Sequence, residues 1–253
     1  MDSARSSPQD VLEVAADAGV HLLSAGGEVS RVEDTMIRIA RGMGLSSVEA
    51  AVFPTALLLS APGATLMRRV RQRSVNLAIV AEVNQLSRDL VACRIDMDTF
   101  RERLLRVPEI RRYRRWQTIL VAGLAGGLLC QLVGGQWYDF LPAMMAGALA
   151  HAVRQSRASL NGSLKDFMAA MAAVVPGLIA ANWAVFHPGT IIVGGIMVLV
   201  PGMAMTSAIR DGLAGDVVSA VSRMLEALLT AVAVAAGVAL PLNLYLAMGG
   251  RWP

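Results

Sequence analysis

The chain has 253 residues, of which 55% are hydrophobic and 17% are charged, whereas soluble domains average roughly 45–50% and about 25%. This composition argues against a purely water-soluble protein and against a disordered one. The charge is also unevenly distributed, because residues 1–115 hold 31 charged side chains and residues 116–253 hold 11. We therefore expect a water-exposed N-terminal region followed by a membrane region.

The basic residues lie where a membrane protein places cytoplasmic charge. The net charge is +4, and all basic residues except Lys165 are arginines. Their densest run directly precedes the apolar half and contains Arg111, Arg112, Arg114 and Arg115. Such a run is typical of the cytoplasmic flank of a first transmembrane helix. Few aromatic residues accompany it for base stacking, so nucleic-acid binding is not expected.

The N-terminus and the cysteines limit the class of protein further. Asp10, Glu13 and Asp17 interrupt the first segment, which therefore lacks the apolar run of a signal peptide and is expected to stay in the cytoplasm. Two cysteines, Cys93 and Cys130, are too few for a disulfide framework or a cysteine metal site. No metal and no cofactor are expected.

Residues 1–115 predict a small cytoplasmic α+β domain. Helical spacing of apolar residues indicates helices over residues 10–24, 30–42, 76–93 and 98–107. Ser30 and Glu33 have the spacing of a capping box, and Asp96 and Asp98 suit the cap of the last helix. Two strands, over residues 48–59 and 65–70, are expected around a turn at Pro62.

Residues 116–253 predict five transmembrane helices, at about 116–136, 139–154, 167–186, 189–209 and 225–248. The first span lies in an uncharged stretch of 23 residues, the third and fourth share one of 43 residues, and the fifth lies in one of 24 residues. Each of these spans is long enough to cross about 30 Å. The second has 14 uncharged residues and is inferred from the positive charges that follow it, Arg154, Arg157 and Lys165. Basic residues then lie mainly inside, which places the N-terminus inside and the C-terminus, with Arg251, outside.

The segment HLLSAGGEVSRVE gathers polar side chains and glycines around a turn: His21, Gly26, Gly27, Glu28, Arg31 and Glu33. A histidine, carboxylates and a guanidinium can support acid–base chemistry or ligand binding. Their spacing matches no metal motif and no nucleophile motif. The alternatives are a structural role, in which caps and ion pairs fix the turn, and a ligand or gating role.

Two proline–glycine pairs, Pro176–Gly177 and Pro201–Gly202, recur 25 residues apart in the third and fourth predicted spans. We expect each pair to break its helix and expose backbone dipoles, as in the discontinuous helices of transporters. Packing kinks are the alternative. Asn182 and Thr206 lie on the same helices and could bond a polar substrate.

Charged residues cluster at the expected inner ends of the fourth and fifth spans: Arg210, Asp211, Asp216, Arg223 and Glu226. Charges at such positions are costly unless they are paired or hydrated. Arg223 and Glu226 are three residues apart and can meet on one helix face. Glu226 lies nearest the interior of its span and is the preferred proton-coupling carboxylate, with a simple interfacial ion pair as the alternative.

Three segments resemble the threonine/serine exporter family of bacterial inner membranes: HLLSAGGEVSRVE, RVRQRSVNLAIVAEVNQLSRDL, and PGMAMTSAIRDGLAGD followed by Arg223. The resemblance extends from about His21 to Met248 and implies a secondary exporter with a cytoplasmic N-terminal domain. It points to the polar and glycine residues of the first segment named above. In the membrane half it points to Pro201, Gly202, Arg210, Asp211, Gly215, Asp216 and Arg223.

Fused members of the family continue into a second, smaller membrane module, whereas this chain stops at Pro253. It therefore resembles the larger subunit of the split form, whose partner is a separate small membrane protein. The split pair known in the family exports C4-dicarboxylates such as succinate, so threonine/serine and dicarboxylates are both candidate substrates. Self-association into a homo-oligomer is a further option.

We thus expect a subunit of a proton-coupled inner-membrane exporter. Arg210 would attract a substrate carboxylate, and Glu226 or Asp211 would carry the proton. Two other classes remain open. One is a membrane-anchored, hydrolase-like enzyme that uses His21, Glu28 and Glu33, and the other is a regulatory subunit that does not itself transport.

Overall fold

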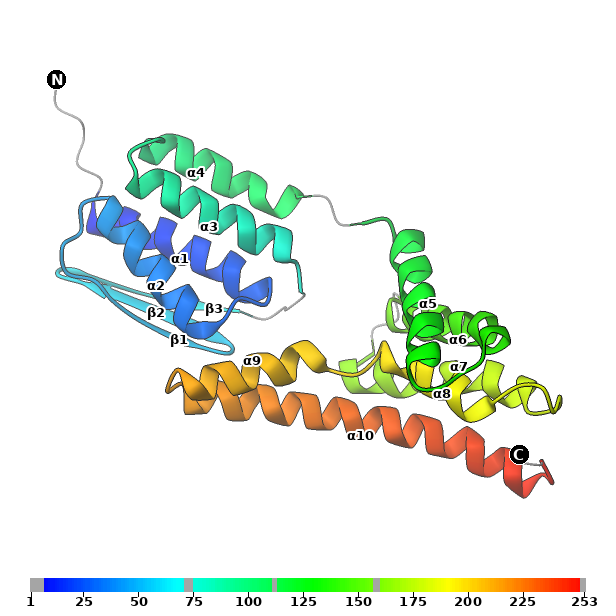
Figure 1. Ribbon diagram of the computed structural model, residues 1–253. Helices are drawn as coiled ribbons and strands as arrows, with labels where there is room; N and C mark the ends of the chain where they lie inside the picture. The colour runs from blue at the N-terminus through cyan, green and yellow to red at the C-terminus, as the bar shows by residue number, and fades with distance from the viewer. Residues whose placement is uncertain (1–6, 71–74, 111–112, 157–159, 251–253) are drawn as a thin grey trace. The chain divides into compact units, whose positions relative to one another are not determined.

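The computed structural model describes residues 7–70, 75–110, 113–156 and 160–250 and is mainly helical (Figure 1). Predictions that concern Arg111, Arg112, Arg157 and Arg251 fall outside the described residues. The chain forms two compact units. The first comprises Met1–Arg112 and Thr206–Arg223, and the second comprises Tyr113–Met205 and Met224–Pro253.

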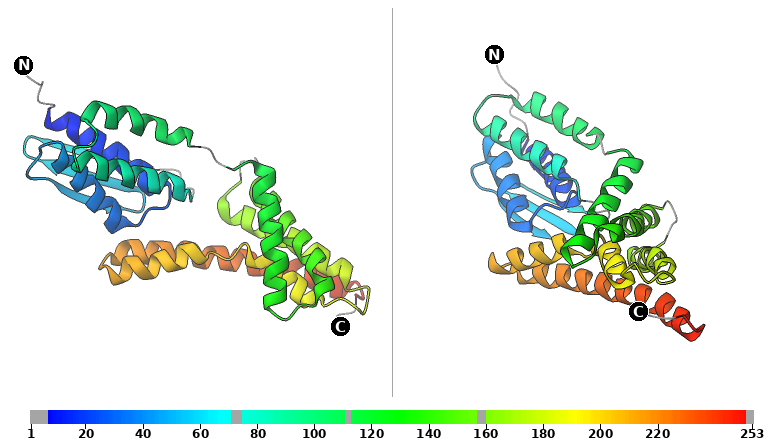
Figure 2. Two further views of the ribbon diagram at one scale, coloured as in Figure 1. Left: turned by 45° about the horizontal axis from the view of Figure 1, so that its top comes forward. Right: turned by 45° about the vertical axis from the view of Figure 1, so that its right-hand side comes forward.

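The first unit is a three-stranded antiparallel sheet with helices on one face (Figures 1 and 2). Its elements are α1 (Pro8–Ser24), α2 (Val29–Gly42), β1 (Glu49–Phe53), β2 (Ala56–Ala61), β3 (Ala64–Arg69), α3 (Leu77–Val91), α4 (Met97–Arg106) and the short 3-10 helix η1 (Val107–Glu109). The end of α9 (Gly202–Leu213) and the start of α10 (Val217–Ala247) also belong to this unit. Helix α1 packs on β2 and β3, α2 packs on β1, and α3 and α4 form a further layer. The fully buried core between these layers includes Leu12, Met36, Ile39, Leu57 and Phe100.

The sheet corrects one prediction, because the expected strand over residues 48–59 is two strands. Phe53 pairs with Ala56, so Pro54 and Thr55 form the turn of a tight hairpin. Proline has no backbone N–H to donate to a strand ladder, and this interrupts the strand. The order of the sheet is therefore β1-β2-β3.

The helix caps are partly as expected. Asp96 caps α4 by accepting a hydrogen bond from the Thr99 amide at 2.9 Å. The capping box expected at Ser30 does not form, because α2 begins at Val29 with Glu28 as its N-cap residue. The Glu33 carboxylate instead accepts a hydrogen bond from the Val52 amide of β1 at 2.7 Å. A contact with the sheet thus replaces the local cap.

The second unit is helical. It contains α5 (Arg115–Leu132), the 3-10 helix η2 (Trp137–Asp139), α6 (Phe140–Arg154), α7 (Gly162–Ala180), α8 (Pro188–Met197) and parts of α9 (Gly202–Leu213) and α10 (Val217–Ala247). Among the described residues, α7 and α10 are each long and apolar enough to cross a membrane. The pair formed by α8 and α9, bent by 53°, counts as a third candidate span by the same criteria.

Glycines allow the helices of the second unit to pack closely. A Cβ atom on Gly126 of α5 would lie 2.9 Å from the Ala143 carbonyl oxygen of α6, and one on Gly147 of α6 would lie 2.8 Å from the Ala122 carbonyl oxygen of α5. Gly194 of α8 approaches α5 in the same way, since its Cβ would lie 2.6 Å from the Gly126 carbonyl oxygen. Small residues bring helix backbones together in this manner in membrane proteins.

The two proline–glycine pairs behave differently, which corrects another prediction. Helix α7 continues through Pro176 without a break, and Gly177 leaves room for α8, where its Cβ would meet Ile192 and the Pro188 carbonyl oxygen. Neighbouring helices can stabilise a proline in this position. In contrast, α8 ends at Met197 and α9 starts at Gly202, directly after Pro201. The break is therefore confined to the second pair.

We predict that Gly194→Ala destabilises the second unit. The added methyl group would collide with backbone of α5, and overpacking of this kind typically costs about 1–3 kcal/mol. The melting temperature of the detergent-purified protein should fall by several degrees. Gly189→Ala, also on α8, is the matched control because its Cβ would meet nothing within 4 Å; equal melting temperatures for the two variants would contradict the prediction.

Candidate functional site

A cluster of five charged residues lies within the first unit: Glu28, Arg31, Arg210, Asp211 and Arg223, called the charged cluster below. Glu28 is the N-cap residue of α2, and its carboxylate is held by two guanidinium groups. Arg31 Nε lies 3.0 Å from Glu28 Oε2, and Arg210 Nη1 of α9 bonds to Glu28 Oε1. The Glu28 side chain is 15% exposed, whereas those of Arg31 and Arg210 are 71% and 61% exposed. Water therefore reaches both cations.

The second ion pair of the charged cluster is buried. Arg223 Nε of α10 lies 2.9 Å from Asp211 Oδ2 of α9, and the two side chains are 11% and 1% exposed. Arg223 Nη2 also donates to the Gly27 carbonyl oxygen at 2.9 Å. Neither Asp211 oxygen has a hydrogen bond of good geometry among the described residues, so electrostatic attraction to Arg223 is the main compensation for burying this charge.

Two glycines shape the backbone beside these ion pairs. Gly26 has a φ of 90°, a left-handed conformation that glycine adopts without a steric penalty, and it ends α1. At Gly27 a Cβ atom would lie 2.8 Å from the Leu22 carbonyl oxygen. Because glycine has no Cβ, the turn can be compact at this position, and the Gly27 carbonyl oxygen accepts its hydrogen bond from Arg223 in this conformation. Gly215, with a φ of 94°, forms the turn between α9 and α10.

Glu33 and Asp216 are close enough to interact electrostatically. Burial raises the pKa of Glu33 above its ordinary value, and the negative charges of Asp216 and Asp34 raise it further, while the hydrogen bond from the Val52 amide acts in the opposite direction. Glu33 is thus coupled electrostatically to Asp216, which lies between α9 and α10, and its hydrogen bond ties α2 to β1.

His21 lies apart from these carboxylates. It lines a pocket with Asp17 of α1 and Arg101 and Leu104 of α4, and neither Glu28 nor Glu33 is among the described residues that line it. Burial lowers the pKa of His21, and Asp17 only partly offsets this effect. His21 is therefore neutral at neutral pH. The structure does not assemble it with Glu28 and Glu33 as the enzyme alternative requires.

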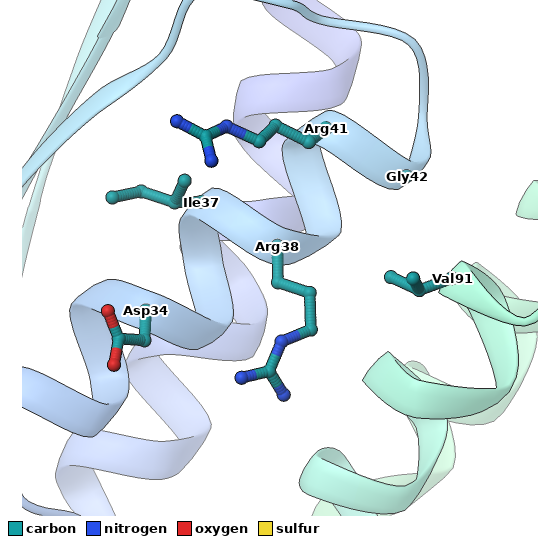
Figure 3. Close-up of a pocket in the computed structure, with 6 residues that line it drawn as sticks. All are labelled: Asp34, Ile37, Arg38, Arg41, Gly42 and Val91. Atoms are coloured by element: carbon teal, nitrogen blue, oxygen red, sulfur yellow. The ribbon is translucent and has the colours of Figure 1, made fainter.

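Another hollow of the first unit lies between α2 and the end of α3 (Figure 3). Its lining includes Asp34, Ile37, Arg38, Arg41, Gly42 and Val91. Figure 3 shows the Arg38 side chain extending from α2 into the space beside α3. None of the residues of the charged cluster lines it, and none of its residues was predicted from the sequence to be functional.

The second unit contains two buried carboxylates that the sequence analysis did not assign to a site. Asp166 of α7 pairs with Arg154 of α6, with Oδ1 and Nε 2.8 Å apart. Asp139 accepts hydrogen bonds from the amides of His187 and Gln136 at 3.0 and 2.8 Å and lies 3.0 Å from His187 Nδ1. One signal was available in the sequence, since Asp139 and Asp166 are the only acidic residues between positions 110 and 210.

The remaining predicted residues lie as follows. The Asn182 side chain donates to the Ile179 carbonyl oxygen at 3.0 Å and so caps the end of α7. Thr206 lies on α9, one turn before Arg210, and Glu226 lies on the exposed side of α10. Over the described ranges, no three or more His, Cys, Asp or Glu side chains are grouped so that they could hold a metal ion.

Comparison with known proteins identifies the class. Residues 13–245 match the ThrE family model, described as "Putative threonine/serine exporter". The chain therefore belongs to the threonine/serine exporter family, and together with its apolar helices this makes it a membrane protein of a transporter family.

Individual relatives cover the chain to different extents. A Klebsiella aerogenes protein named "Probable succinate transporter subunit YjjP" is 25% identical over 97% of this chain and 98% of its own length. A "Probable threonine/serine exporter" of Mycobacterium tuberculosis is 26% identical over 92% of this chain and 46% of its own length. The "Threonine/serine exporter" of Corynebacterium glutamicum is 29% identical over 48% of this chain and 26% of its own length. No solved structure matches the chain.

We predict that Glu33→Gln stabilises the protein more at pH 7 than at pH 4. Because the pKa of Glu33 is raised on folding, the native state binds more protons than the unfolded state between the ordinary and the raised pKa, and stability falls as pH rises through that window. Glutamine removes this cost and can still accept the Val52 hydrogen bond. Melting temperatures at both pH values test this, with the exposed Glu82→Gln as control. The same shift at both pH values would contradict it.

Proposed function

We propose that the chain is the larger subunit of a two-component exporter in the bacterial inner (plasma) membrane. It moves small metabolites that carry a carboxylate, either threonine and serine or C4-dicarboxylates such as succinate, and it is driven by protons. The family match and the names of the relatives support this assignment. A small membrane protein of the same family is the proposed partner, because the relatives of equal length are named as subunits.

We further propose that residues 1–115 lie in the cytoplasm and that residues 116–253 cross the membrane five times. The uneven distribution of charge supports this arrangement, since basic residues would then be concentrated in the cytoplasmic connections. The two or three candidate spans among the described residues are compatible with it. Helices α5 and α6 supply the first two proposed spans.

The observation that carries the proposed function is the carboxylate of Glu28 between the guanidiniums of Arg31 and Arg210. Two cations that converge on one carboxylate form a geometry that also suits the carboxylate of a substrate. Both arginines are mostly exposed, so a solute from water can compete with Glu28. Either substrate class carries such a group, and a dicarboxylate carries two.

The break between α8 and α9 supports the proposed substrate path. Helix α9 begins after Pro201 and carries Thr206 and Arg210. In many transporters, discontinuous helices of this kind line the substrate site. The residues proposed for the substrate path are Pro176, Gly177, Asn182, Pro201, Gly202, Thr206 and Arg210. The buried pair of Asp211 and Arg223, with Asp216 and Glu226 beside it in sequence, is the proposed gate.

We predict that Arg210→Ala lowers efflux of the exported solute about tenfold or more. A hydrogen bond to a charged group contributes about 1.5–3 kcal/mol, and about 1.4 kcal/mol corresponds to a factor of ten. Efflux of preloaded threonine and succinate is measured in cells that lack their own exporters, with the chain alone and beside a small partner. Arg41→Ala, an exposed arginine of α2 outside the charged cluster, should leave efflux unchanged.

Two results would reject this function. Unchanged efflux in a well-expressed Arg210→Ala variant would remove the substrate role of Arg210. Efflux by the small partner alone, at the full rate, would make this chain a regulatory subunit.

We also predict that Asp211→Asn or Glu226→Gln weakens the dependence of efflux on external pH. An amide cannot carry a proton through a transport cycle, whereas its size and shape resemble those of the carboxyl group. Initial efflux rates between pH 5.5 and 8 give the profile. If both variants keep the full pH dependence of the original protein, neither residue couples protons to transport.

A further inference from the structure

A small pocket, called the His21 pocket below, lies between α1 and α4 of the first unit. Its lining includes Asp17 and His21 of α1 and Arg101 of α4, and its apolar wall includes Val14 and Leu104, which belong to the buried core. The volume is about 190 Å³, roughly that of six water molecules at about 30 Å³ each. Pockets for drug-sized ligands start at about 300 Å³. The His21 pocket therefore has the size of a small metabolite.

Two opposite charges line the His21 pocket without neutralising each other. Asp17 and Arg101 come from different helices and form no ion pair with each other. The Asp17 carboxylate has only a loose contact with a cation, since its Oδ1 lies 3.8 Å from Arg68 Nε of β3, and these side chains are 53% and 40% exposed. Such an exposed pair contributes little to stability. The Arg101 guanidinium has no hydrogen bond or ion pair with any residue that the structure describes, so both charges can bind a ligand.

A carboxylate and a guanidinium on opposite sides of a small pocket match a zwitterion. At neutral pH an α-amino acid carries an ammonium group and a carboxylate. Arg101 can hold the carboxylate with two parallel hydrogen bonds, while the ammonium group donates to Asp17. A dicarboxylate would bring its second negative charge near Asp17, which is unfavourable because like charges repel. The two charges therefore favour an amino acid over a dicarboxylate.

His21 supplies a polar group that can recognise the side chain of the ligand. Burial lowers the pKa of His21, so its ring is neutral at neutral pH and offers one donor and one acceptor nitrogen. A hydroxyl group is also both donor and acceptor and can bond to either nitrogen. Val14 and Leu104 provide apolar contact for a methyl or methylene group. The lining thus suits a short side chain that carries a hydroxyl group.

We propose that the His21 pocket binds a small α-amino acid with a hydroxyl side chain, such as threonine or serine. Arg101 holds the carboxylate of the ligand, Asp17 holds its ammonium group, and His21 bonds to its hydroxyl group. The bound molecule joins α1 to α4. The pocket shares no residue with the charged cluster, so it is a second ligand site, and its occupation does not depend on the proposed export.

The first test is calorimetric titration of the full chain purified in detergent. The ligands are threonine, 3-hydroxybutyrate, which lacks the ammonium group, and succinate, which has two carboxylates. We expect saturable binding of threonine and at least tenfold weaker binding of the other two. The titrations are repeated with Arg210→Ala, which lacks the arginine proposed to bind a transported solute. This variant should still bind threonine in the His21 pocket, with an affinity within about twofold of the original.

Variants of the pocket locate the binding. Arg101→Gln and Asp17→Asn should each weaken threonine binding at least tenfold. Asp17→Asn should not weaken the binding of 3-hydroxybutyrate, because that ligand has no ammonium group to pair with Asp17. Arg103→Gln, an exposed arginine of the same helix that does not line the pocket, is the control and should bind threonine like the original. Both altered pocket residues are exposed, so the variants should fold, which their melting temperatures verify.

The outcomes separate this inference from the proposed function. Absence of saturable binding of threonine and serine to the folded protein would overturn the inference, and equal affinities for threonine and 3-hydroxybutyrate would overturn the assignment of an amino acid. Binding that disappears in Arg210→Ala but persists in Arg101→Gln and Asp17→Asn would also overturn it, while supporting the proposed transport site. Binding that depends on Arg101 and Asp17, in a protein that exports neither solute, supports the inference and rejects the proposed function.

Discussion

The cost of burying a carboxylate is the constraint on which the structure depends. Among the residues that the structure describes, three aspartates are almost completely buried, and each has a cationic or hydrogen-bonding partner from another element: Asp211 with Arg223, Asp166 with Arg154, and Asp139 with His187. Removal of one partner from such a pair costs several kcal/mol, because the other charge remains in a medium of low polarity. Each pair therefore fixes which two segments must lie together, and the apolar residues pack around these fixed points.

The helices of the second unit can lie close together only because their facing residues are small. Gly126, Gly147 and Gly194 allow backbone contact between α5, α6 and α8. Side chains of long hydrophobic residues in the same unit point outward, as the exposed Leu120, Leu128 and Leu141 illustrate. An inner surface of small residues with a few paired charges and an outer surface of large apolar side chains is the arrangement expected when the surroundings are lipid, since lipid offers no hydrophobic drive for helix association.

Local patterns in the sequence predicted most helices, but contacts between distant residues required the structure. Helix α1 and the cap of α4 follow from apolar spacing and from Asp96. The sequence could not show that the helix breaks at Pro201 and continues through Pro176. The effect of a proline depends on the neighbouring helix, which for Pro176 is α8 beside Gly177. It grouped His21 with Glu28 by proximity along the chain, although they lie on different sides of the α1–α2 turn. It also missed Asp166, whose partners are 12 and 64 residues away.

The exposure of the two ion pairs in the charged cluster assigns them different roles. Arg223 and Asp211 are buried, and Arg223 is bound a second time by the Gly27 carbonyl oxygen, so exchange with a solute would leave a buried charge unpaired. Arg31 and Arg210 remain hydrated while they hold Glu28, so neither cation would be left buried and unpaired if its contact with Glu28 were lost. The buried pair therefore attaches the α1–α2 turn to α9 and α10, and the proposed exchange of a solute anion would take place at the exposed arginines.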